Sequence, residues 1–150
     1  MYKKILVALE NGRADDTLVP HIAELALALG SELLLFHVAD GFAARNYEQL
    51  KLAESDEIRA DRAYLETVAA RLRATGLTVG TELAMGNPPT EILRTAQARA
   101  CDLIAMTSHG HKFIGDFFLG GTIDKVRHNT TIPILVVRAG SGTASPFPPK

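Results

Sequence analysis

The sequence has a single cysteine, almost no net charge and no long hydrophobic run, and each of these absences excludes a class of protein. The lone Cys101 excludes an internal disulfide framework and every CxxC metal or redox motif. Sixteen basic and 17 acidic residues leave a formal net charge of −1, which argues against binding nucleic acid by neutralising phosphates. The apolar run Ile5 to Leu9 is too short for a signal peptide or a membrane span. We therefore expect a cytoplasmic protein with no membrane and no nucleic-acid partner.

The length and the hydrophobic content predict one folded domain. A chain of 150 residues that is 47% hydrophobic suits a single compact core. No internal repeat or linker divides it. Residues 139–150 are rich in Gly, Ser and Pro, which predicts a flexible tail after a domain spanning residues 1–138.

Apolar runs alternate with amphipathic stretches along the whole domain. Five runs are expected to form strands: 5–9, 33–38, 77–85, 102–106 and 132–137. Helices are expected at about 18–29, from 58 to before 76, from 88 onward, and at about 120–129. Mostly unbroken apolar strands that alternate with helices predict an α/β fold. We expect an open, doubly wound, five-stranded parallel sheet with strand order 3-2-1-4-5 and helices on both faces. The alternating pattern of 77–85 places that strand nearer an edge.

Two of the expected helices contain residues that break the helical pattern. Pro20 lies where proline is unfavourable unless it falls in a first turn, so the sequence leaves open where the first helix starts. In the second helix, Asp61 and Arg62 occupy places where the apolar stripe would continue back to Ile58.

The segments that follow the strands are the candidate ligand contacts, because such sheets bind ligands beyond the carboxyl ends of their strands. The segment 107–122 is the richest in glycine, with Gly110, Gly115, Gly120 and Gly121. Its last glycines open a helix, whose free N–H groups favour an anion. His111 and Lys112 add candidate positive charge. A glycine-rich loop also serves ordinary turns, and the pattern alone leaves both readings open.

The chain resembles the universal stress protein family over about residues 3 to 138. The matching segments are Lys4-Ile5-Leu6-Val7, Leu35-Phe36-His37-Val38, Gly86-Asn87-Pro88, Asp102-Leu103-Ile104-Ala105-Met106, Ser108-His109-Gly110, Leu119-Gly120 and 132–138. ATP-binding members carry Gly, two residues, Gly, nine residues, then Gly followed by Ser or Thr. On this sequence the four positions fall on Thr107, Gly110, Gly120 and Gly121, so the spacing is intact while the first and last identities differ.

The resemblance implies a stress-response regulatory protein that binds ATP or a related adenine nucleotide, with or without Mg²⁺, and hydrolyses it slowly or not at all. The phosphates would bind a set of residues between the fourth strand and the last helix: Thr107, Gly110, His111, Lys112, Gly120, Gly121 and Thr122. The base and ribose would lie beside Ala8, Leu9, Glu10 and Val38, with Met106 beneath. Glu10 stands where family members usually have aspartate. The alternative interpretation is that Glu10 is a solvated carboxylate at the end of a strand.

Two other functions remain open. The departures at Thr107 and Gly121 favour an interaction protein whose pocket is vestigial. A small phosphotransfer or hydrolytic enzyme has only the phosphate loop in its favour, and no residue is identified as a general base. The histidines lack the convergent partners that a metal site needs, and Cys101 is expected to be a small buried residue.

The last strand predicts a homodimer. Residues 132–138 are nearly all apolar, yet the expected strand order leaves them on a sheet edge, where free N–H and C=O groups invite pairing. We expect this strand to meet its copy antiparallel about a twofold axis, as the family resemblance also implies.

Overall fold

A computed structural model describes residues 1–39, 56–108 and 121–139 of the chain. In chain order the elements are β1 (Lys4–Ala8), α1 (Asp15–Leu29), β2 (Glu32–Ala39), α3 (Asp56–Ala74), β3 (Val79–Met85), α4 (Pro88–Ala98), β4 (Leu103–Ser108), α5 (Gly121–His128) and β5 (Ile134–Arg138). Residues 40–55, most of the glycine-rich segment and nearly all of the expected tail lie outside the described residues.

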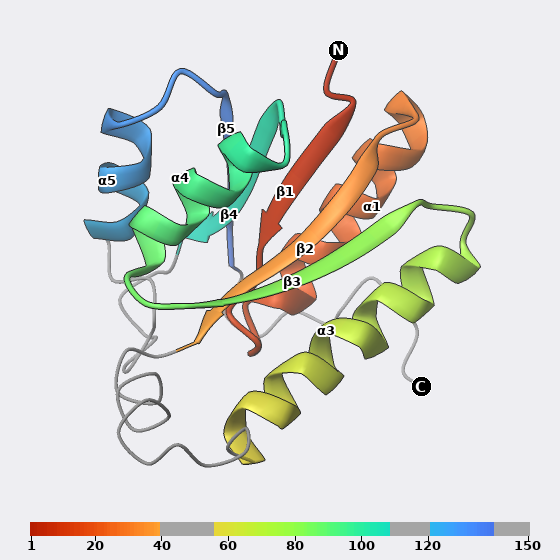
Figure 1. Ribbon diagram of the computed structural model, residues 1–150. Coiled ribbons are helices and arrows are strands. Elements are labelled where there is room, and N and C mark those ends of the chain that lie inside the picture. Colours follow the sequence, from red (N-terminus) through yellow and green to blue (C-terminus); the bar gives the residue numbers. More distant parts are fainter. Residues whose placement is uncertain (40–55, 109–120, 140–150) are drawn as a thin grey trace.

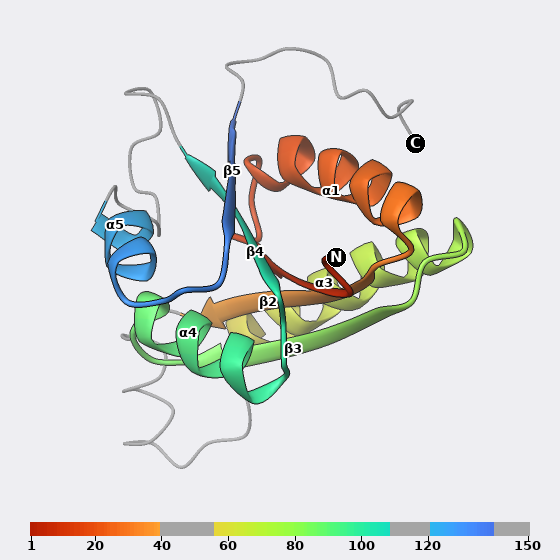
Figure 2. The same cartoon turned by 90° about the horizontal axis from the view of Figure 1, so that it is seen from above.

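The five strands form one parallel sheet in the order β3-β2-β1-β4-β5, as predicted (Figure 1). Side chains that alternate along each strand build two cores. One lies under α1 and α3 and contains Val7, Leu18 and Leu65. The other lies under α4 and α5 and contains Phe36, Ile92 and Val126. Figure 2 shows α1 on one side of the sheet and α4 with α5 on the other.

The helices begin and end largely where the sequence predicts. Gly30 takes a left-handed backbone conformation (φ 70°) after α1, which glycine adopts without steric penalty. Asn87 caps α4, because its side chain accepts a hydrogen bond from the Thr90 N–H, and Pro88 opens that helix. The unexpected feature is Pro20, which lies well inside α1, beyond its first turn, and is buried.

The end of β4 differs from the sequence prediction. A loop was expected from Thr107, but Thr107 and Ser108 belong to the strand, where they pair with Val137 and Arg138 of β5. The pairing continues to Ala139, whose N–H donates to the Ser108 carbonyl at 2.9 Å. The backbone hydrogen bonds of β5 therefore extend β4 beyond its apolar run, which had suggested an end at Met106. β5 itself begins at Ile134.

Candidate functional site

The carboxyl ends of β1, β2 and β4 lie side by side along one edge of the sheet, the carboxyl edge, which runs across the ends of the strands. Parallel pairing aligns Ala8 with Phe36 and Val7 with Ala105. The predicted nucleoside contacts Ala8, Leu9, Val38 and Met106 are therefore brought to this edge, and all four are at most 1% exposed. Their side chains face different ways: Leu9 packs in the core under α1 and α3, and the other three pack in the core under α4 and α5. A ligand at this edge would meet the backbone of the strand ends before these side chains.

Thr107 occupies a strand position that needs no unusual backbone. It is fully buried, and among the described residues with positive φ the non-glycines are Tyr2, Asn11 and Ala100. The threonine at this position is therefore compatible with its backbone conformation. Its hydroxyl is buried without a hydrogen-bond partner in the described part of the chain. Because alternate residues of a strand share a face, Thr107 lies on the same face of the sheet as Ala105, away from α5.

The two other phosphate candidates that the structure describes open α5. Gly121 is its first residue, and among the described residues a Cβ added there would meet no atom within 4 Å beyond the chain neighbours and the helix backbone. Thr122 is buried on the same side of α5 as Val126, one turn along the helix. Because α5 connects two parallel strands, its amino end lies at the edge where β4 ends. Gly110, His111, Lys112 and Gly120 lie outside the described residues.

The loop after β1 is held by a buried carboxylate of α1. Asp15 accepts hydrogen bonds from the backbone N–H of Glu10 at 2.9 Å and of Gly12 at 3.3 Å, and from the Tyr64 hydroxyl at 2.9 Å. Burial raises the pKa of Asp15 although these donors lower it. Burial and the nearby Asp15 charge raise the pKa of Tyr64.

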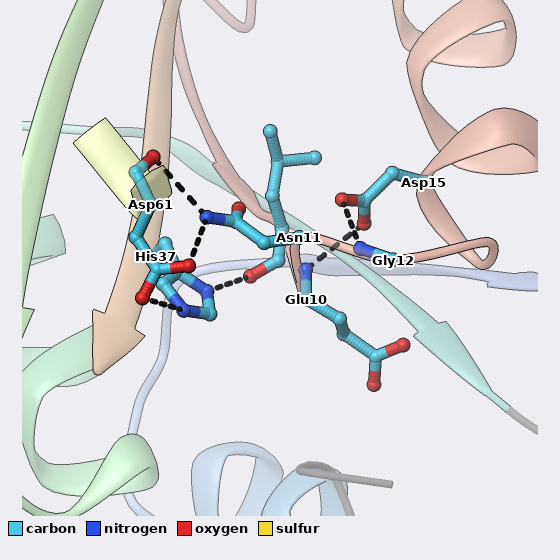
Figure 3. A network of polar contacts seen from close by, with 7 residues as sticks. Glu10, Asn11, Gly12, Asp15, His37 and Asp61 are labelled. Carbon is cyan, nitrogen blue, oxygen red and sulfur yellow. Dashed lines mark hydrogen bonds and ion pairs between the residues drawn. The ribbon is translucent and has the colours of Figure 1, made fainter. Parts of the chain in front are cut away.

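A second set of polar contacts holds the same loop from α3 (Figure 3). The Asn11 amide donates to the Asp61 backbone oxygen at 3.3 Å and to Asp61 Oδ1 at 3.1 Å. His37 Nε2 lies 3.6 Å from Asp61 Oδ2, and its Nδ1 lies 2.8 Å from the Leu9 carbonyl oxygen. Because a carbonyl oxygen only accepts, Nδ1 carries the hydrogen. Glu10, which stands between the two sets of contacts, points its side chain away from both carboxylates (Figure 3).

Sequence reasoning missed this network. The sequence indicates His37 only as part of a segment that resembles the family, and Asp61 only as a break in an apolar stripe. That break was the available signal, because a charged residue on the buried side of a helix requires a polar partner.

The remaining candidates have structural explanations. Cys101 is buried, and burial raises the pKa of its thiol to about 11, which makes it unreactive near neutral pH. Within the described ranges, no group of three or more His, Cys, Asp or Glu side chains could hold a metal ion. None of the described helices combines the length and the apolar character needed to cross a membrane.

The fold and this edge define a doubly wound α/β protein with a candidate ligand site where β1, β2 and β4 end. The chain belongs to the Universal stress protein family, whose sequence model matches residues 1–138. Universal stress protein MJ0577 of Methanocaldococcus jannaschii is 25% identical over 158 aligned positions, which cover 92% of this chain and 96% of that protein. Its solved structure has a TM-score of 0.74 at 24% identity and covers 95% of this chain and 99% of that chain.

Two further solved structures share the fold. A universal stress protein in complex with cAMP has a TM-score of 0.68 at 17% identity, covering 93% of this chain and 98% of that one. A universal stress protein from Archaeoglobus fulgidus in complex with dAMP has a TM-score of 0.65 at 19% identity, covering 91% and 98%.

Proposed function

We propose that this chain is a stress-response regulatory protein that binds an adenine nucleotide, ATP in the first place, at the carboxyl edge of its sheet. Relatives of the same fold have been solved with cAMP and with dAMP, which supports adenine as the base. The preserved spacing of Gly110 and Gly120 supports phosphate binding in the segment 107–122. The protein would act in the cytoplasm, where thiols such as that of Cys101 stay reduced.

The observation that carries this proposal is the amino end of α5, which begins at Gly121. The first N–H groups of a helix have no partner within the helix and attract anions. In the part of the chain that the structure describes, no atom beyond the chain neighbours and the backbone of α5 lies within 4 Å of the position of a Gly121 Cβ, which supports the approach of a phosphate to the backbone there. Glu10, at the end of β1, is then the candidate partner for ribose or base hydroxyl and amino groups.

Catalysis is proposed to be slow or absent. A general base must be within hydrogen-bond reach of the attacking water. Asp15 and Asp61, the carboxylates that hold the loop after β1, are both engaged by hydrogen bonds to that loop. Neither is therefore placed to activate water, which favours a regulatory binding protein over a hydrolase.

The test is a thermal-shift and calorimetric series with ATP, AMP and GTP, each with and without Mg²⁺. We expect ATP and AMP to raise the melting temperature and GTP to do so less. Replacing Glu10 by Ala should weaken the binding of AMP and of ATP by a similar factor. Glu24→Ala, on the exposed side of α1, serves as the control. If no nucleotide shifts the melting temperature of the wild-type protein, the alternative of an interaction protein with a vestigial pocket is correct.

We also propose a homodimer formed through Ile132 to Arg138. Within the described residues β5 pairs only with β4, so its outer edge has unpaired backbone groups. Val136 is 43% exposed on this strand. The opposite edge strand, β3, instead carries Thr81 and Glu82, which bind Glu66 and Arg99. Charged and polar groups discourage pairing, so β5 is the edge that a second copy would cover.

A further inference from the structure

The short segment from Leu9 to Gly12 is anchored by carboxylates of two different helices. On one side, Asp15 of α1 accepts hydrogen bonds from the N–H groups of Glu10 and Gly12. On the other side, Asp61 of α3 accepts hydrogen bonds from the Asn11 amide. Asp61 also faces His37, which contacts the Leu9 carbonyl. Asp15 holds the Glu10 N–H itself, whereas Asp61 and His37 hold the residues on either side, and the Glu10 side chain points away from both carboxylates (Figure 3).

The contact with Asp61 holds a backbone conformation that few residues adopt. Asn11 has a φ of 56°, in the left-handed region, which asparagine tolerates better than most side chains. Two hydrogen bonds from its amide to Asp61 fix the side chain, and with it the turn that follows Glu10. His37 fixes the other side, because its Nδ1–H donates to the carbonyl of the residue before Glu10.

From this geometry we infer that Asp61 is a positioning residue for the nucleotide site: through Asn11 and His37 it orients the Glu10 backbone and so the Glu10 carboxylate. The inference rests on the proposed function. It assigns Asp61 to the nucleoside end of the ligand, because Asp61 acts on the loop after β1, whereas the amino end of α5 follows β4.

This assignment predicts a selective loss of affinity. Asp61→Ala should weaken the binding of AMP and of ATP by the same factor, about tenfold. Losses of this size are common for residues coupled in one hydrogen-bond network. The ratio of ATP to AMP affinity should stay at its wild-type value, because that ratio reports the phosphate contacts at α5. A merely structural role for Asp61 would lower the melting temperature without this pattern.

Conservative and matched variants sharpen the test. Asp61→Asn should restore most of the affinity, since its amide oxygen can still accept a hydrogen bond from the Asn11 amide. Glu66→Ala removes another carboxylate of α3, which binds Thr81 and Arg73, and should leave AMP affinity unchanged. Asn11→Gly removes the same contact from the loop side and suits the left-handed backbone, so it tests the inference even if Asp61→Ala does not fold.

The experiment is calorimetric titration of AMP and ATP into the full chain and these four variants, with amide hydrogen exchange of the free proteins. We expect faster exchange at Glu10 and Gly12 in Asp61→Ala than in the wild type or Glu66→Ala. If the wild type binds AMP, and folded Asp61→Ala and Asn11→Gly bind it with the same affinity, the inference is wrong and the proposed function stands. A wild-type protein that binds neither nucleotide would overturn both.

Discussion

Replacing Gly121 by serine tests whether the phosphates bind at the amino end of α5. Gly121 stands where the four-position pattern that the family resemblance implies has Ser or Thr. The described residues can accept the change, because beyond the chain neighbours and the backbone of α5 none of their atoms lies within 4 Å of a Cβ at Gly121, and Gly121 has no positive φ. Serine at the start of a helix is well tolerated.

The size of the effect follows from one added hydrogen bond. A hydrogen bond to a charged phosphate contributes about 1.5–3 kcal/mol, and ordering the side chain costs about 0.5–1.5 kcal/mol. The difference of the two ranges is about 0–2.5 kcal/mol, and a net gain near 1.4 kcal/mol, close to the middle, corresponds to about tenfold tighter binding. Gly121→Ser and Gly121→Ala both add a Cβ at the first residue of α5, so these two variants differ only in the hydroxyl.

The assay is calorimetric titration of ATP into the wild type, Gly121→Ser and Gly121→Ala. Alanine is the matched control, since it changes the helix propensity without adding a hydroxyl. We expect Gly121→Ser to bind ATP more tightly than Gly121→Ala, while adenosine binds the two variants equally. Equal ATP affinities in two folded variants would refute the reasoning and show that the phosphates bind elsewhere.

Three further predictions concern stability, reactivity and assembly. Because burial raises the folded-state pKa of Asp15 above its ordinary 3.8, its contribution to stability is greatest below that pH and declines as the pH rises through the folded pKa. In urea titrations, the free energy of unfolding of the wild type minus that of Asp15→Asn should thus decrease from about pH 3 to pH 7. A difference that stays constant with pH would contradict this direction. Cys101 should react slowly with iodoacetamide at neutral pH until urea is added, and immediate alkylation of the folded protein would contradict its burial. Light scattering should give about twice the 16.2 kDa chain mass, and Val136→Lys should shift it toward the monomer; a monomeric wild type would exclude the dimer.

The fold was predictable because its signals are local and mutually consistent. Unbroken apolar runs such as Ile5 to Leu9 indicate strands covered on both faces, and Gly30 and Asn87 mark helix ends by their own backbone and side-chain chemistry. The order β3-β2-β1-β4-β5 follows from right-handed crossovers together with the resemblance. The end of β4 was mispredicted because Thr107 and Ser108 are extended by pairing with β5, which is distant in the sequence.

The candidate site was predictable only in part. The strand ends Ala8, Val38 and Met106 reach one edge, as any parallel sheet requires. The side on which each side chain packs, and the anchoring of Asn11 by Asp61, depend on contacts between residues 50 positions apart. No local pattern encodes such a contact, although a charged residue in an apolar stripe marks the place where one is needed.

The central claim, that this chain binds an adenine nucleotide, is tested most directly by identifying what the protein carries when it is purified. The purified protein is denatured, the released small molecules are analysed by mass spectrometry, and the stripped, refolded chain is titrated with ATP in a calorimeter. We predict a released adenine nucleotide, or saturable one-to-one ATP binding by the stripped protein. No released nucleotide together with no heat at millimolar ATP would contradict the account.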